Sequence, residues 1–337
     1  MSLRKTLPLI LASAAISTAP GADPIFTAPV GFVKLGNTAG GMAPAVAANS
    51  DTRLTIPLEQ SVEFTGTVDL STSNTVKVTG SPGWTTDQWT PGTGEPFGVI
   101  IKSGAEDGLR ALITAHTADT LTVSVTSPGD LTNLVSGDSI SIRKCWTLQN
   151  LVAGQVIPDG TQLLLWSETL SDINQISTDS YVFGGGNWYN NVGFSDGNNV
   201  ILHPGESFVL RTPPGTSIAN LTLFGDVPDS ALRNILHKDG PTGAEDLHIA
   251  SMLPVPSLVA DLAIPVKDGD QLFVYDPAGT GINQPASDSY VFGGGSWYNN
   301  IGFANVTATL TMEPGLGYIV RRAASSPTTE EWTEPAP

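Results

Sequence analysis

The sequence predicts an all-β protein made of two related β-sandwich-like repeat units, with a small β-barrel domain inserted into the first. Only 14% of the 337 residues are charged, whereas 36 are glycine and 25 are proline, a composition that suits strands and turns better than surface helices. Short runs of alternating apolar and polar residues follow one another closely in the first half. In the second half one segment occurs twice, as DSYVFGGGNWYNNVGF from Asp179 to Phe194 and as DSYVFGGGSWYNNIGF from Asp288 to Phe303.

Residues 1–19 have the form of a secretory signal peptide. Two basic residues precede an apolar run from Leu7 to Ile16, and small residues surround an expected cleavage site after Ser17 or Ala19. This run is too short to cross a bilayer, and no later run reaches about 18 apolar residues. We therefore expect a secreted protein, located outside the cell or at its surface, without a membrane span.

The charge argues against a nucleic-acid-binding protein, and the cysteine content argues against a disulfide-stabilised one. A formal net charge of −17 argues against a nucleic-acid partner, because binding to a phosphate backbone needs clustered Lys and Arg. Cys145 is the single cysteine, so an intramolecular disulfide is excluded and packing has to stabilise the fold. Its place beside Trp146 at a strand end favours a small buried apolar side chain over a reactive thiol.

Residues 20–60 are predicted to contain the N-terminal strand and the start of repeat unit A. The segments from Pro29 to Leu35 and from Thr52 to Leu58 have strand composition. Residues 61–145 then contain six strand-like runs separated by turns, and closing these runs into a small barrel would protect their edges. In Thr120 to Val125 apolar residues alternate with Thr and Ser, as in a strand with one buried face.

The rest of unit A is predicted to cover residues 146–225, and unit B to cover residues 247–323. Segments of unit A recur in unit B in the same order and at nearly constant spacing, which indicates a duplication. The paired segments are Asp159 to Trp166 with Asp268 to Tyr275, Ile173 to Gln175 with Ile282 to Gln284, and Leu202 to Arg211 with Met312 to Arg321.

Two segments flank unit B. The predicted connector, residues 226–246, includes a short helix from Ser230 to His237, in which apolar residues recur at helical spacing after the capping residue Asp229. The tail, residues 324–337, is acidic and rich in proline, and we expect it to be disordered.

The repeated glycine triplet predicts a tight hairpin turn. It neither leads into a helix nor ends in GK[ST], so a phosphate-binding loop is excluded. Glycines supply the positive φ angles of such a turn, and a second turn follows at the paired asparagines. The turn glycines are Gly184, Gly185 and Gly186 in unit A, and Gly293, Gly294 and Gly295 in unit B.

The residues after the glycines are the candidates for a working surface. Aromatic rings beside amide side chains suit a neutral sugar, which has apolar faces and hydroxyl edges. The same uncharged, repeated surface suits self-association, in which Trp and Tyr are frequent anchors. Packing of one aromatic set in the core is the third interpretation. The candidates are Trp188, Tyr189, Asn190, Asn191, Trp297, Tyr298, Asn299 and Asn300.

No catalytic set is recognisable, so we predict that the protein is not an enzyme and has no catalytic residue. The four histidines, His116, His203, His237 and His248, stand in no HExxH, HxH or Gly-x-Ser-x-Gly context. We expect no cofactor and no metal. Oxygen-rich turns leave a structural calcium ion open as an alternative, although their spacing matches no complete calcium loop.

Several motifs together resemble an uncharacterised family of secreted β-rich proteins found mainly in verrucomicrobial bacteria. These motifs are PVGFVKL after the signal peptide, the short-strand insert, DGTQLLLW, YVFGGGNWYNN and PGESFVLR. The resemblance implies export and a β fold, and it carries no activity and no catalytic residue onto this chain.

These observations favour a secreted or cell-surface structural β-protein that assembles with copies of itself into a filament or surface layer. The alternative is a secreted carbohydrate-binding or adhesive module that holds a glycan with its Trp and Tyr hairpins. The expected partners are accordingly other copies of the chain or a glycan.

Overall fold

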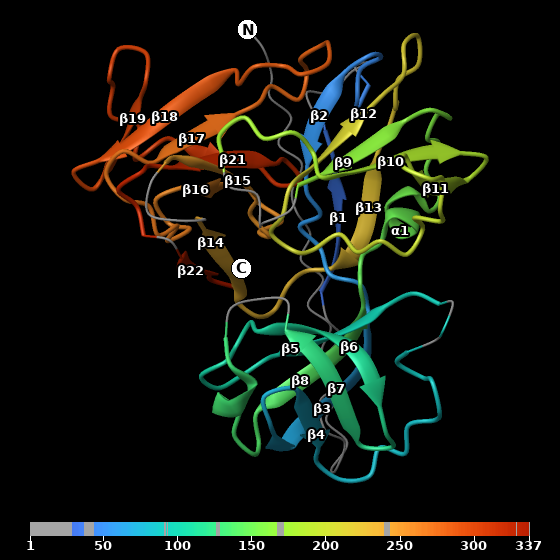
Figure 1. Cartoon of the computed structure of the whole chain (residues 1–337). Coiled ribbons are helices and arrows are strands. Elements are labelled where there is room, and N and C mark those ends of the chain that lie inside the picture. The colour runs from blue at the N-terminus through green and yellow to red at the C-terminus, as the bar shows by residue number, and fades with distance from the viewer. Residues whose placement is uncertain are drawn as a thin grey trace, which may run out of the picture.

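The computed structural model describes residues 29–36, 44–90, 92, 94–125, 129–166, 172–238, 243–327 and 329–336. Strands account for 41% and helices for 3%, which confirms the predicted all-β class. Three hydrophobic cores divide the molecule into a barrel and two further units that lie side by side above it in Figure 1. The expected signal peptide lies outside the described residues.

The six strand-like runs between residues 61 and 145 form a closed antiparallel barrel. The strand order is β3-β4-β7-β6-β5-β8, and β3 also pairs with β8, so the sheet has no open edge. In that pair Val62 lies opposite Arg143, so the chain enters and leaves the barrel at one place. The strands are β3 (Val62–Ser71), β4 (Thr75–Val78), β5 (Phe97–Ile101), β6 (Arg110–His116), β7 (Thr120–Val125) and β8 (Ser139–Lys144), with a 3-10 helix, η1 (Leu131–Asn133), before β8.

Unit A contains a five-stranded antiparallel sheet in the order β11-β10-β9-β12-β2, and a separate pair, β1 with β13. The barrel is inserted between β2 and β9 in the sequence, two strands of the same sheet. The strands are β1 (Val30–Lys34), β2 (Asp51–Leu54), β9 (Gln162–Leu165), β10 (Asp179–Gly184), β11 (Asn187–Asn190), β12 (Phe208–Arg211) and β13 (Thr222–Asp226).

Unit B has a five-stranded sheet in the order β15-β21-β17-β18-β19, in which β15 corresponds to β2, β21 to β12, and β17, β18 and β19 to β9, β10 and β11. A pair of strands, β14 with β22, corresponds to β1 with β13. The strands are β14 (Leu232–His237), β15 (Glu245–Ile249), β16 (Ser257–Leu258), β17 (Gln271–Val274), β18 (Asp288–Gly293), β19 (Ser296–Asn299), β20 (Thr311–Met312), β21 (Tyr318–Arg322) and β22 (Thr329–Glu334).

The prediction of a helix from Ser230 to His237 is wrong, because Leu232–His237 form the strand β14. Leu232 and Leu236 are both buried. A spacing of four residues places two side chains on one face of a helix and equally on one face of a strand, so this pattern alone does not distinguish them. Pairing with β22 makes the segment a strand.

The prediction of a disordered tail is also wrong for the described residues, since β22 pairs with β14 along its whole length. Trp332 is fully buried in the core of unit B, and its indole N–H donates a 2.7 Å hydrogen bond to the carbonyl of Leu262. Unit B therefore runs from β14 to β22, beyond the predicted 247–323. The predicted connector 226–246 shrinks to the few residues between β13 and β14.

Among the described residues, one α-helix was not predicted. α1 (Leu148–Val152) begins after Thr147, whose hydroxyl accepts a 3.3 Å hydrogen bond from the backbone N–H of Asn150. Its apolar side chains pack into the core of unit A. The helix is too short to give a visible period in the sequence.

Trp332→Ala should lower the free energy of unfolding by about 3–5 kcal/mol, because the substitution leaves a large cavity in the core of unit B. Urea unfolding followed by far-UV circular dichroism measures this loss. Thr333→Ala is the matched control, since the neighbouring Thr333 is exposed on the same strand. Equal stability of both variants would mean that the tail does not dock.

Candidate functional site

The repeated segment of unit A forms a hairpin with a two-residue turn. Gly184 lies opposite Asn187 at the ends of β10 and β11. The turn residues Gly185 and Gly186 have φ angles of +58° and +86°, the signs that a type I′ turn requires. The carboxylate of Asp159 accepts a 3.0 Å hydrogen bond from the N–H of Gly185 and fixes the turn to the preceding loop.

Unit B repeats this hairpin. Gly294 and Gly295 have φ angles of +57° and +79°, and Asp268 accepts a 2.9 Å hydrogen bond from the N–H of Gly294. Gly293, like Gly184, ends its strand without a positive φ. The predicted hairpin is thus present twice, and only the second and third glycines of each triplet need the left-handed region.

The two tryptophans of the hairpins are core residues. Trp188 is 0% exposed and Trp297 is 2% exposed. Each packs edge-on against a phenylalanine of the paired strand, with centroids 5.3 Å apart for Phe183 and Trp188. A sugar ring needs an open aromatic face, so the expectation of Trp platforms is wrong. Tyr189 is half-buried, and so is Tyr298.

The predicted asparagines of unit A build the second turn. Asn190 Oδ1 accepts a 2.7 Å hydrogen bond from the N–H of Val192, and the Asn190 carbonyl accepts a 3.1 Å hydrogen bond from the N–H of Phe194. Asn191 Nδ2 donates to the hydroxyl of Ser180 at 3.0 Å. Both amide groups thus form hydrogen bonds within the hairpin.

The asparagines of unit B have the same roles. Asn299 Oδ1 accepts from the N–H of Ile301 at 2.6 Å, and the Asn299 carbonyl accepts from the N–H of Phe303 at 3.1 Å. Asn300 Nδ2 donates to the hydroxyl of Ser289 at 3.0 Å. The two second turns are therefore built alike.

Each second turn holds two large apolar side chains out of the protein. Val192 and Phe194 are 85% and 69% exposed, and Ile301 and Phe303 are 85% and 70% exposed. Both phenylalanines have φ angles in the left-handed region, +54° and +53°, which is uncommon outside glycine and asparagine. We call these pairs the apolar tips. The sequence signal for them was the repeated VGF or IGF within an otherwise polar turn.

The outer edges of the two sheets are already covered by their own chain. Beyond β11, Asn190 donates its N–H to the carbonyl of Ser195, and Gly197 donates to the carbonyl of Trp188. The chain returning from β19 covers that strand in the same way. A further strand therefore meets no free ladder here, and a contact at these ends has to use side chains.

The two tips lie far apart. β11 and β19 are the outermost strands of their sheets, and Figure 1 shows them at opposite ends of the paired units. The molecule thus presents the same pair of apolar side chains at two opposite ends of the paired units.

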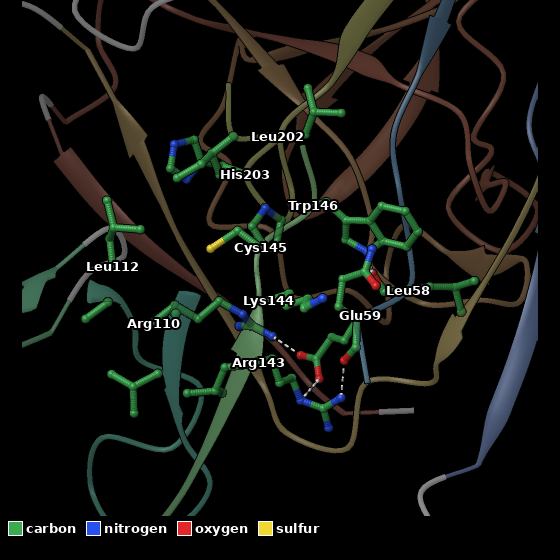
Figure 2. A pocket seen from close by; sticks show the side chains of 17 residues that line it. Leu58, Glu59, Arg110, Leu112, Arg143, Lys144, Cys145, Trp146, Leu202 and His203 are labelled. Atoms are coloured by element: carbon green, nitrogen blue, oxygen red, sulfur yellow. Dashed lines mark hydrogen bonds and ion pairs between the residues drawn. The ribbon is translucent and has the colours of Figure 1, made fainter. Parts of the chain in front are cut away.

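A narrow cavity of about 70 Å³ lies at the junction of the barrel and unit A. Glu59, 4% exposed, reaches between two arginines of the barrel (Figure 2): its Oε1 lies 2.7 Å from Arg110 Nη2 and its Oε2 lies 3.2 Å from Arg143 Nε. Arg143 also pairs with Asp226 of β13 at 2.6 Å. Burial raises the pKa of Glu59, but the arginines outweigh it, and the net pKa is lowered.

Cys145 lines the same cavity, as does His203 (Figure 2). Burial raises the pKa of the Cys145 thiol to about 12, so the thiol stays protonated at neutral pH and is not an activated nucleophile. The ion pairs and apolar contacts here join the barrel to unit A, which is a structural role.

Acidic side chains in β15 and in the polar turns have partners within the protein. Asp246 forms an ion pair with Arg321 at 2.6 Å, and Asp196 and Asp276 each accept a 2.8 Å hydrogen bond from a backbone N–H two residues on. Within the described ranges, no three His, Cys, Asp or Glu side chains are grouped to hold a metal ion.

Comparison with known proteins gives no match to a protein family, a curated protein or a solved structure. The resemblance to the verrucomicrobial family therefore rests on the sequence motifs alone. In the part of the chain that the structure describes, no helix is long and apolar enough to span a membrane.

Proposed function

We propose that the protein is a secreted or cell-surface structural β-protein that assembles with copies of itself through its two apolar tips. The observation that carries this proposal is that the same exposed apolar pair occurs at opposite ends of the two paired units. Contacts at two opposite ends of a subunit generate an open filament unless the rotation between subunits closes a ring.

The expected strength of one contact is low. Full burial of a Val, Ile or Phe side chain contributes about 1.5–3 kcal/mol. A contact between two tips buries four such side chains at most, whereas association itself costs about 4–15 kcal/mol. Assembly should therefore depend strongly on protein concentration and should gain from many linked contacts.

The alternative of glycan binding by the hairpins has less support. Its two strongest stacking residues, Trp188 and Trp297, are buried, and its amide side chains are hydrogen-bonded within their own hairpins. The apolar tips offer no polar group to a sugar hydroxyl.

The test is the assembly state of the mature chain over a wide concentration range, by sedimentation velocity and negative-stain electron microscopy. The double variant Phe194→Asn with Phe303→Asn should assemble only at protein concentrations at least tenfold higher, because both large rings are lost. Asparagine tolerates the left-handed region, so the turns should keep their shape.

Val156→Thr is the matched control, since Val156 is 87% exposed and belongs to neither tip. A variant of one tip alone shows whether like tips or unlike tips pair between subunits. If like tips pair, Phe194→Asn alone should stop at dimers, whereas if unlike tips pair, it should not assemble. Monomers of the unmodified chain at every concentration would refute the proposal.

A further inference from the structure

A second cavity, of about 470 Å³, lies where the two five-stranded sheets face each other. Corresponding positions of the two units line it. Arg53 of β2 pairs with Val209, and the corresponding His248 of β15 pairs with Ile319, so the two sheets present these residues in the same register. We call this the central cavity.

At the rim of the cavity each unit has an Arg–Asp ion pair, and an asparagine of the other unit bonds to both members of that pair. In unit A, Arg211 binds Asp51 with two hydrogen bonds of 2.6 and 2.8 Å, and Asn283 of unit B bonds to both residues. In unit B, Arg321 binds Asp246 through hydrogen bonds of 2.6 and 2.9 Å. Asn174 of unit A, the counterpart of Asn283, bonds to both of these. Both rim arginines are thus neutralised.

The centre of the cavity is not symmetric, because the duplicated positions have different residues. Arg53 Nη1 lies 2.5 Å from Nδ1 of His248. The guanidinium carbon of Arg53 lies 4.7 Å from the ring centroid of Tyr275 and 5.1 Å from that of Trp166. Trp166 in turn stacks on His248, with centroids 4.1 Å apart and planes inclined by 14°. Trp166 and Tyr275 are themselves counterparts in the two units.

Arg53 has no carboxylate within ion-pair distance among the described residues, unlike the two rim arginines. Its Nε is buried without an acceptor. Burial and the neighbouring Arg53 lower the pKa of His248 well below its ordinary value, so His248 is neutral and does not balance the charge. Arg53 therefore brings to the cavity a positive charge without an ion-pair partner in the described part of the chain, although the carboxylate of Asp276 also lines the cavity.

We propose that the central cavity binds a small organic carboxylate, with the carboxylate at Arg53 and the body of the ligand against the aromatic walls. A guanidinium suits a planar carboxylate because it donates parallel hydrogen bonds. Leu164, Phe273 and Ile319 add apolar lining, which favours an organic anion over inorganic phosphate. The volume lies within the usual range of small-molecule sites, about 300–1,000 Å³.

Isothermal titration calorimetry on the mature chain tests this proposal, with benzoate and glucuronate as probes up to about 10 mM. Benzyl alcohol and glucose are the uncharged analogues, and inorganic phosphate is the competing anion. We expect one site per chain, at least tenfold weaker binding of the uncharged analogue of whichever carboxylate binds, and weaker binding of phosphate. Arg53→Gln should weaken carboxylate binding at least tenfold, whereas Lys77→Gln on the barrel surface should leave it unchanged.

A second readout is needed if Arg53→Gln unfolds. Carboxylate binding should change the tryptophan fluorescence of the unmodified protein, and this change should be absent in Trp166→Phe, which keeps an aromatic wall. Three results would each overturn the proposal: no heat and no fluorescence change with either carboxylate, equal binding of the uncharged analogues or of phosphate, or full binding by a folded Arg53→Gln variant. This test does not depend on the assembly state.

Discussion

Glu59→Gln should lower the free energy of unfolding by about 3–5 kcal/mol, the usual cost of breaking a buried ion pair. The substitution keeps the size of the side chain but removes the charge that faces Arg110 and Arg143. Arg143 keeps Asp226 as a partner, whereas Arg110, 8% exposed at its side chain, loses its 2.7 Å ion pair with Glu59. Urea unfolding at neutral pH measures the change.

The matched control is Asp69→Asn, which breaks the exposed pair of Asp69 and Lys77 on the barrel and should have a barely measurable effect. The pH dependence gives a second check. The pKa of Glu59 is lowered from 4.5 in the folded protein, so its contribution is complete above that value and is lost as the pH falls through the lower folded-state pKa. The difference between the parent protein and Glu59→Gln should therefore shrink on acidification. A constant difference would contradict the assigned charge interaction.

Trp188→Ala and Trp297→Ala should each cost about 3–5 kcal/mol of unfolding free energy, because each removes a buried indole from a separate core. Distant substitutions add, so the double variant should lose about 6–10 kcal/mol. A typical domain has only about 5–15 kcal/mol, and we therefore expect the double variant to be largely unfolded.

Tyr189→Ala is the control for this prediction, since Tyr189 lies on the same strand as Trp188 but is half-buried. Thermal unfolding and near-UV circular dichroism of the parent protein and the four variants give the comparison. If the tryptophan variants kept the parent stability, the hairpin rings would be exposed in solution and the sugar-platform hypothesis would regain support.

Local patterns predicted the hairpins and the barrel strands well. The glycine triplet fixes a type I′ turn by backbone geometry alone, and the short alternating runs of the barrel are bounded by clear turn residues. Long-range pairing was not predictable in this way. The strand β14 has a spacing of apolar residues that suits a helix too, and its partner β22 lies in a segment whose composition favours disorder.

The candidate surface was predicted only in part for a related reason. Strand alternation places Trp188 and Tyr189 on opposite faces, but it does not say which face meets the core. That choice follows from the packing of β9, β10 and α1 in unit A. The central cavity depends on residues such as Asp51 and Arg211, which are far apart in the sequence and meet only in the folded sheet.

Across the central cavity, Asn174 of unit A and Asn283 of unit B each bond to the ion pair of the other unit. Such reciprocal contacts are typical of the interface between two identical subunits, but here both copies belong to one chain. Two identical subunits related by a two-fold axis would have to bring like residues together at the axis, for example two arginines with the same charge. Linking the copies removes this constraint, because each can mutate alone. Arg53 can therefore face the neutral ring of His248, and Trp166 can differ from Tyr275. The duplication thus makes available an asymmetric centre that two identical subunits do not have.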